Sequence, residues 1–156
     1  ISAVDAFLKI TGIQGESTDD KHKGEIEVLS WSWGSSNSGT LSRGSGAGAG
    51  KACFNEFTIT KRTDAASPGL MVAVMTGAIK AEAILSVRKA GGSQQDYLKI
   101  ELKDVQISSF QHAGASDNPM ESVSFNFTEL TFKYSQQKDD GSLLPAVQGN
   151  VRGTSC

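Results

Sequence analysis

The fold class is indicated by one stretch near the C-terminal end, Val123-Ser124-Phe125-Asn126-Phe127-Thr128-Glu129-Leu130-Thr131-Phe132-Lys133-Tyr134. Large apolar side chains stand at positions 123, 125 and 127 and then, in the opposite phase, at 130, 132 and 134. Because successive side chains of a β-strand point to opposite faces, this period of two predicts strands with one buried face. The alternation recurs in Val4–Ile10, Leu29–Trp33, Phe57–Ile59, Ala83–Val87 and Leu98–Leu102. The chain is therefore predicted to be mainly β, with mostly antiparallel strands.

Two of the alternating stretches change phase midway. Phe127 gives way to Leu130, and Val28 gives way to Leu29 and Trp31. A β-bulge swaps the buried face in this way, and it lets a long strand bend around the corner of a barrel. We therefore expect an antiparallel β-barrel of two sheets, closed or nearly closed, that takes up residues 1–156 as a single domain.

One segment lacks the alternation and predicts a flanking α-helix over about residues 68–76. Ser67 is a candidate N-cap, Pro68 occupies the first helical position, and Gly77 ends the segment. Two pairs of apolar residues four apart give the helix an apolar face, namely Leu70/Val74 and Met71/Met75. We expect this face, methionines included, to pack into the core.

The stretch from Gly34 to Lys51 is a long Gly/Ser-rich loop. Leu41 and Arg43 are its only large side chains before Lys51. Loops of this length in compact domains tend to be functional or disordered. Two interpretations follow: a flexible surface excursion, or an arm that orders against a partner.

Composition and charge exclude several classes of protein. The 156 residues carry 15 basic and 17 acidic side chains, a net charge of −2, and 38% are hydrophobic. A protein that coats nucleic acid normally carries a positive surplus, so no nucleic-acid partner is expected. No apolar run approaches the roughly 18 residues of a membrane-spanning helix, and the first residues do not form a secretory signal. Neither membrane insertion nor signal-peptide export is expected.

The two cysteines, Cys53 and Cys156, stand far apart in the sequence and do not suggest a disulfide framework. We expect Cys53 to be a small buried strand residue and Cys156 to lie unbonded at the end of the chain. A reducing cytoplasm fits this cysteine usage best.

Candidate catalytic and ligand-binding motifs fail when their spacing is tested. The glycine-rich stretch before Lys51 has Ser45 where a phosphate-binding loop needs Gly, and Ala52 where it needs Ser or Thr. Neither His22 nor His112 has a Cys or His at metal-ligand spacing. We therefore expect no enzyme activity, no cofactor and no metal.

A monomeric β-barrel module that binds oligosaccharide or single-stranded nucleic acid remains an alternative function. Trp31 and Trp33 could serve as its stacking platforms. They share the phase of Leu29, which favours a buried tryptophan pair over an exposed one.

A set of short motifs is similar to those of the Hcp family, the haemolysin-coregulated tube proteins of bacterial type VI secretion systems. The resemblance covers Val4 to about Gly141 and rests on Gly15–His22, Glu25–Gly34, Asn37–Gly39, Gly48–Lys51, Phe57–Lys61, Ser67–Met71, Val87–Gly92 and Tyr134–Lys138. The chain departs from the family at its end, where Val147–Cys156 replaces the usual Gly-Trp segment.

The resemblance implies a structural protein that forms a six-membered ring. Stacked rings would build the inner tube that the type VI sheath expels together with its spike proteins, and small effector proteins would ride in the lumen. The resemblance places Ser32 on the lumen wall. It assigns subunit contact or ring stacking to the loop residues Asn37, Ser38, Gly39, Leu41 and Arg43. The protein would reside in the bacterial cytoplasm before firing and then be secreted without a signal peptide.

Overall fold

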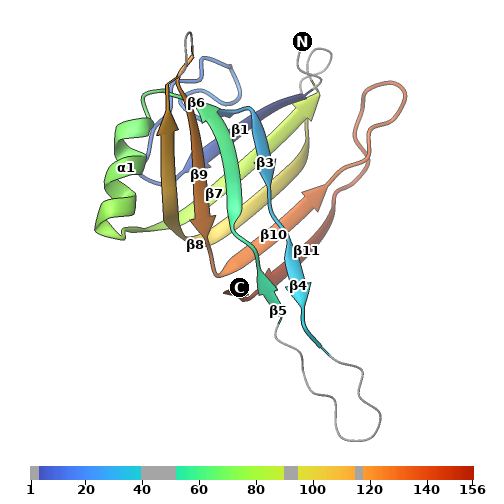
Figure 1. Ribbon diagram of the computed structural model, residues 1–156. Helices are drawn as coiled ribbons and strands as arrows, with labels where there is room; N and C mark the ends of the chain where they lie inside the picture. The colour runs from blue at the N-terminus through green and yellow to red at the C-terminus, as the bar shows by residue number, and fades with distance from the viewer. Residues whose placement is uncertain (1–3, 40–51, 90–94, 115–117) are drawn as a thin grey trace, which may run out of the picture.

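The computed structural model describes residues 4–39, 52–89, 95–114 and 118–156, and within them it contains one helix and twelve strands (Figure 1). In chain order the elements are β1 (Val4–Ile10), β2 (Ile26–Val28), β3 (Ser30–Ser32), β4 (Ser35–Asn37), β5 (Ala52–Phe54), β6 (Phe57–Arg62), α1 (Ser67–Thr76), β7 (Ile79–Lys89), β8 (Asp96–Ala113), β9 (Met120–Asn126), β10 (Glu129–Tyr134), β11 (Val147–Arg152) and β12 (Thr154–Ser155). The predicted mainly β class and the expected helix range are confirmed.

The strands form two sheets. The larger sheet has nine strands in the order β2-β1-β7-β8-β9-β6-β3, with β10 and β11 branching from β8, and its pairings are antiparallel. The smaller sheet has the order β12-β5-β4, and β12 runs parallel to β5. In Figure 1 the larger sheet curls around the core, and β4 and β5 run away from it.

The larger sheet is not a closed barrel, because its end strands β2 and β3 do not pair with each other. They are consecutive in the chain and separated only by Leu29, whose backbone N–H donates to the Thr60 carbonyl at 2.8 Å. The change of phase expected here is therefore a break between two strands rather than a bulge. Leu29 is 45% exposed, so its expected place on the buried face with Trp31 is wrong.

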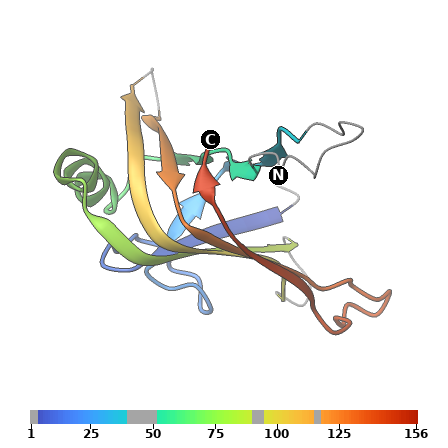
Figure 2. The same cartoon turned by 90° about the horizontal axis from the view of Figure 1, so that it is seen from below.

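The second change of phase is also a strand break. β9 ends at Asn126 and β10 begins at Glu129, and both pair with the same edge of the 18-residue strand β8. The register shifts of the larger sheet lie elsewhere, between Val87 and Arg88 and between Ile107 and Ser109. The long strand β8 bends around the core in Figure 2, so it carries the corner that we expected where Phe127 gives way to Leu130.

The core lies inside the curled sheet and follows the predicted alternation. Residues of the inward phase on six strands and on α1 are almost completely buried, among them Leu8, Ile26, Phe57, Ile59, Leu70, Leu85, Ile100, Leu102, Val123 and Phe125. Burying each such side chain is worth about 1.5–3 kcal/mol. This apolar contact fixes which face of each strand points outward, and so positions the surfaces described below.

The helix α1 begins after Ala66, and Gly77 ends it in the left-handed conformation at φ 68°. Ser67 does not cap it as expected, because Ser67 lies inside the helix and its hydroxyl bonds elsewhere. Leu70 is buried as predicted, but Met71 and Met75 are 50% and 82% exposed. The expectation that the methionines pack into the core is therefore wrong.

The two cysteines form a disulfide bond in the structure, which contradicts the expectation that they stay apart. Cys53 on β5 and Cys156 after β12 have Cα atoms 4.9 Å apart, although 103 positions separate them in sequence. The reason is the parallel pairing of β12 with β5, in which Thr154 lies opposite Cys53. Cys53 is also only partly buried.

Candidate channel and assembly surfaces

One outward face of the larger sheet carries small hydroxyl side chains across four strands. The ladder registers place Ser30 of β3 beside Thr60 of β6, which lies beside Ser122 of β9 and then Gln111 of β8. A second row runs from Ser32 of β3 through Thr58 of β6 and Ser124 of β9 to Ser109 of β8. We call these two rows the hydroxyl face; its members are Ser30, Ser32, Thr58, Thr60, Ser109, Gln111, Ser122 and Ser124.

The hydroxyl face points away from the core because the intervening residues point into it. Ile59 and Val123 alternate with the hydroxyl residues on β6 and β9, and both are fully buried. Ser32 is exposed at the edge of its row. Next to it in the same row, Thr58 and Ser124 share a hydrogen bond of 3.0 Å between their hydroxyl oxygens. The face has no ionisable group, so it offers weak polar contacts with little preference for charge.

The predicted loop residues lie partly within the described chain. Asn37 ends β4, and Asn37, Ser38 and Gly39 are all exposed. The Asn37 side-chain oxygen accepts a hydrogen bond of 2.8 Å from the Gly39 backbone N–H. Leu41 and Arg43 lie outside the described residues. β4 and β5 pair antiparallel and point away from the curled sheet (Figure 1).

Trp31 and Trp33 are half-buried and pack against the core. The Trp33 ring lies 5.6 Å from the ring of Phe132 on β10. Neither indole stands free as a stacking platform, which weakens the alternative of a ligand-binding module.

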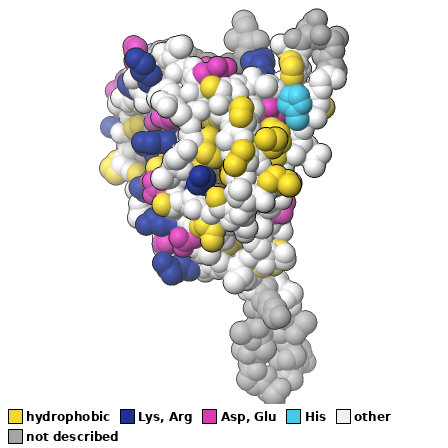
Figure 3. Space-filling view, turned by 90° about the vertical axis from the view of Figure 1, so that its left-hand side faces the viewer, with side chains coloured by type: hydrophobic (Ala, Val, Ile, Leu, Met, Phe, Trp, Pro, Cys, Tyr) yellow, Lys and Arg dark blue, Asp and Glu magenta, His cyan; other side chains and the backbone are white. Residues whose placement is uncertain are grey.

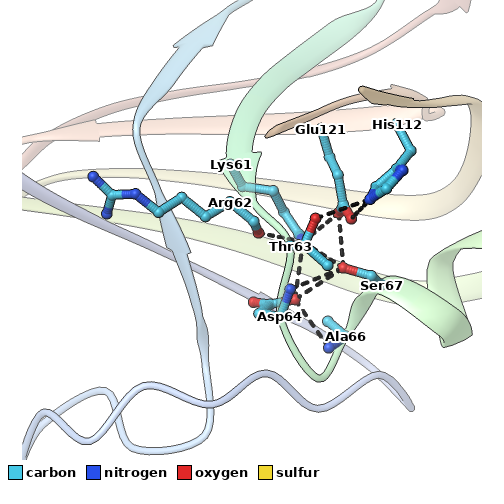
Figure 4. Close-up of polar contacts among 8 residues, drawn as sticks. All are labelled: Lys61, Arg62, Thr63, Asp64, Ala66, Ser67, His112 and Glu121. Carbon is cyan, nitrogen blue, oxygen red and sulfur yellow. Dashed lines mark hydrogen bonds and ion pairs between the residues drawn. The ribbon is translucent and has the colours of Figure 1, made fainter. Parts of the chain in front are cut away.

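A buried ion pair connects β6, β9 and the start of α1 (Figure 4). Lys61 and Glu121 lie opposite each other in the ladder, both side chains are fully buried, and Lys61 Nζ contacts Glu121 Oε1 at 2.6 Å. The same ammonium group donates to Asp64 at 2.9 Å and to the Ser67 hydroxyl at 3.1 Å, and Ser67 donates to Glu121 at 2.8 Å. The network therefore ties the first turn of α1 to the sheet.

The ionisation of Glu121 follows from this network. Burial alone would raise the pKa of the Glu121 carboxyl, but hydrogen bonds from Lys61 and Ser67 outweigh burial and leave the pKa below its usual value. The half-exposed His112 lies at the edge, with Nε2 3.1 Å from the Thr63 hydroxyl and 3.9 Å from Glu121 Oε2.

A second polar cluster holds the loop between β1 and β2 against the sheet. Arg88 of β7 donates to both carboxylate oxygens of Asp19, one at 2.9 Å, and this hydrogen bonding holds the pKa of Asp19 below its usual value. His22 stacks on Phe7 and contacts Glu25 and Asp96 at 3.0 Å each. These contacts give Asp19 and His22 a structural role within the motif from Gly15 to His22.

Sequence reasoning missed both polar clusters, although one signal was present. Lys61 shares the inward phase of Phe57 and Ile59, and Glu121 shares that of Val123. Opposite charges on the inward faces of two strands predict that those strands are neighbours. In the part of the chain that the structure describes, no cluster of His, Cys, Asp and Glu could hold a metal ion. The one described helix is too short to cross a membrane.

Comparisons with known proteins agree on one family. The family model described as type VI secretion system effector, Hcp, matches residues 7–134. Protein hcp1 of Pseudomonas aeruginosa is 49% identical over 143 residues, covering 90% of this chain and 88% of that protein. A solved type six secretion system protein superposes with a TM-score of 0.85 at 34% identity, covering 95% of this chain and 93% of the other. A type VI effector from Yersinia pestis gives 0.78 at 32% identity, covering 95% and 99%.

Proposed function

The chain belongs to the Hcp family of type VI secretion proteins, a family of structural secreted proteins rather than enzymes, and from this premise we propose that it is a tube component. In this proposal six copies close into a ring, and rings stack into the inner tube that the sheath and spike proteins accompany. The protein acts by assembly and carries no catalytic activity. It stays in the bacterial cytoplasm until firing and leaves it without a signal peptide.

The hydroxyl face is the observation that carries this proposal, and we assign it to the wall of the tube lumen. It spans four strands, is free of charge and, apart from Gln111, is built from short hydroxyl side chains. A passage for folded cargo needs a wall that contacts many proteins without holding any of them strongly. The outward surface of β8, β10 and β11 at the opposite flank is charged instead. Ion pairs between strands join Lys133 to Glu101 at 3.0 Å and Arg152 to Glu129 at 3.7 Å, and we call this surface the charged flank.

Ser32 is the proposed point of effector contact. It is exposed at the end of β3, and its neighbours in the same row are hydroxyl residues, so a bound effector meets hydrogen-bonding groups with no steric obstacle. A longer side chain at this position would project into the space that the cargo occupies.

The loop between β4 and β5 is proposed to contact an adjacent subunit or the next ring. Asn37, Ser38 and Gly39 are exposed at its base, where the strands leave the curled sheet. We extend the assignment to Leu41 and Arg43 on the strength of the sequence alone. Deletion of residues 40–48 should leave the circular dichroism spectrum unchanged and shorten the tubes seen by electron microscopy. Tubes of normal length would remove the loop from the proposal.

The lumen assignment is tested by electron microscopy of averaged rings. Ser30→Trp on the hydroxyl face should narrow the central channel, and Lys103→Trp on the charged flank of β8 is the matched control that should leave it unchanged. Both residues are exposed, so neither substitution disturbs the core. A channel that narrows with Lys103→Trp and not with Ser30→Trp would place the charged flank of β8, and not the hydroxyl face, in the lumen.

A further inference from the structure

The end of the chain connects the two sheets. β11 pairs with β10 of the larger sheet, and after Gly153 the chain continues as β12, which pairs with β5 of the smaller sheet. The Cys156 backbone N–H donates to the Phe54 carbonyl at 2.9 Å. The Cys53–Cys156 bond closes this connection, and Figure 1 places the C-terminus beside β5.

The pairing of β12 with β5 buries no apolar side chain of β12. This strand has two residues, and Thr154, Ser155 and Cys156 are all exposed. A chain end that buries so little frays unless it is tied down. β5 differs, because Phe54 is buried and its ring lies 4.8 Å from that of Phe127. The disulfide therefore determines whether the chain end stays on β5, while β5 stays on the core in either redox state.

The bond is open to small reagents. Cys156 is exposed, and Cys53 borders a hollow of about 340 Å³ whose wall includes Phe54 and Arg152. β12 itself borders a second hollow, of about 320 Å³, together with Ile79 just after α1. Figure 3 views the flank that carries α1, where hydrophobic side chains gather near the centre. Because exposed disulfides are the ones that exchange readily with thiols in solution, this bond is suited to opening and closing in the folded protein.

Ser36 of β4 lies against both sulfur atoms. Its hydroxyl oxygen is 3.4 Å from Cys53 Sγ and 3.7 Å from Cys156 Sγ. When the bond opens, one sulfur leaves as a thiolate, and a hydrogen bond to a charged group is stronger than one to a neutral group. Ser36 is therefore placed to stabilise the leaving thiolate.

We propose that the Cys53–Cys156 bond is a redox latch on the chain end, opened by a low-molecular-weight thiol such as glutathione and closed by the corresponding disulfide. In opening, a glutathione thiolate attacks the exposed Cys156 Sγ, the protein disulfide breaks, and Cys53 leaves as a thiolate. A second glutathione thiolate attacks the glutathione sulfur of the mixed disulfide and releases Cys156. Two glutathione molecules are oxidised to one disulfide, their two protons pass to the two cysteines, and closing is the reverse.

The biological setting of the latch rests on the proposed function. Thiols stay reduced in the cytoplasm, whereas disulfides persist outside the cell. A tube subunit meets the first environment before firing and the second after secretion, so its chain end is released during assembly and fixed outside the cell.

Thiol counting in glutathione buffers tests the exchange. The full chain is equilibrated without denaturant at graded ratios of reduced to oxidised glutathione, its thiols are blocked with N-ethylmaleimide, and the intact mass is measured. Wild type should change from no adduct to two adducts as the ratio rises. Ser36→Ala should slow opening about tenfold, and Ser36→Thr should restore the wild-type rate. The same adduct count at every ratio overturns the latch, and equal rates for wild type and Ser36→Ala overturn the role of Ser36.

Amide hydrogen exchange tests the release of β12. The Cys156 N–H should exchange about tenfold faster or more in the reduced protein, because its bond to Phe54 is lost. The Leu29 N–H, bonded to the Thr60 carbonyl, is the internal control whose rate should not change. Cys53→Ser/Cys156→Ser should match the reduced wild type at every glutathione ratio. Equal exchange at position 156 in both redox states of the wild type would overturn the latch.

Light scattering on the same samples separates this inference from the proposed function. Rings in both redox states together with an unchanging thiol count overturn the latch and leave the tube proposal standing. A single-chain mass in both states overturns the tube proposal and the biological setting of the latch, while a thiol count and an exchange rate that follow the glutathione ratio still support the latch itself.

Discussion

Replacing Lys61 with methionine should destabilise the protein more than any surface substitution. Methionine has a similar length but no charge, so the variant leaves the Glu121 carboxylate fully buried without its partner at 2.6 Å. Removing one partner of a buried ion pair typically costs about 3–5 kcal/mol. A domain of about 150 residues loses roughly 2–4 °C of Tm per kcal/mol, so the expected loss is about 6–20 °C.

The control is a variant in which Glu121 is replaced together with Lys61. The double variant Lys61→Met/Glu121→Leu removes both charges, and a buried pair replaced by apolar residues of similar volume is often neutral in stability. It should therefore recover most of the Tm lost by Lys61→Met. Thermal and urea unfolding followed by circular dichroism measure all three proteins. A single variant within about 1 kcal/mol of wild type, or a double variant no better than the single, would refute the buried-pair account.

The remaining predictions concern the disulfide, acid stability and cargo. Cys156→Ser removes the bond that closes a loop of about 100 residues, and the chain-entropy model predicts that the free energy of unfolding falls by about 4.7 kcal/mol relative to oxidised wild type. The variant should be as stable as the reduced wild type. Equal urea midpoints for the variant, the oxidised wild type and the reduced wild type would contradict the bond. Arg88→Gln should destabilise near neutral pH but not in acid: the lowered pKa of Asp19 stabilises the fold above the unfolded carboxyl pKa of about 4, and this contribution disappears as pH falls through the lower folded value. A difference in the free energy of unfolding between wild type and Arg88→Gln that stays constant down to about pH 2 would be inconsistent with this linkage. Ser32→Gln should form rings of normal mass yet co-purify with less effector protein, and undiminished effector would remove Ser32 from the lumen wall.

The alternation in the sequence predicts the strands but not which strands become neighbours. Ser30, Thr60 and Ser122 are scattered along the chain, and the hydroxyl face exists only because β3, β6 and β9 pair in one register. Period-two patterning identifies the outward residues of each strand separately. The pairing that collects them depends on contacts between distant segments.

The helix and the cysteines show why other expectations failed. α1 is apolar nearly all around, so its pattern does not decide which side the sheet covers, and the packing buries Leu70 and leaves Met75 exposed. Cys156 meets Cys53 because the end of the chain returns alongside β5. Sequence separation carries no information about such a return.

The central claim, a ring of six subunits, is tested most directly by the mass of the purified wild-type protein in solution. Light scattering on a gel-filtered sample should give six times the chain mass of 16.4 kDa, about 98 kDa. The mass should persist with reductant, since the Cys53–Cys156 bond lies within one chain. A single species of 16.4 kDa would contradict the account and favour the monomeric binding module.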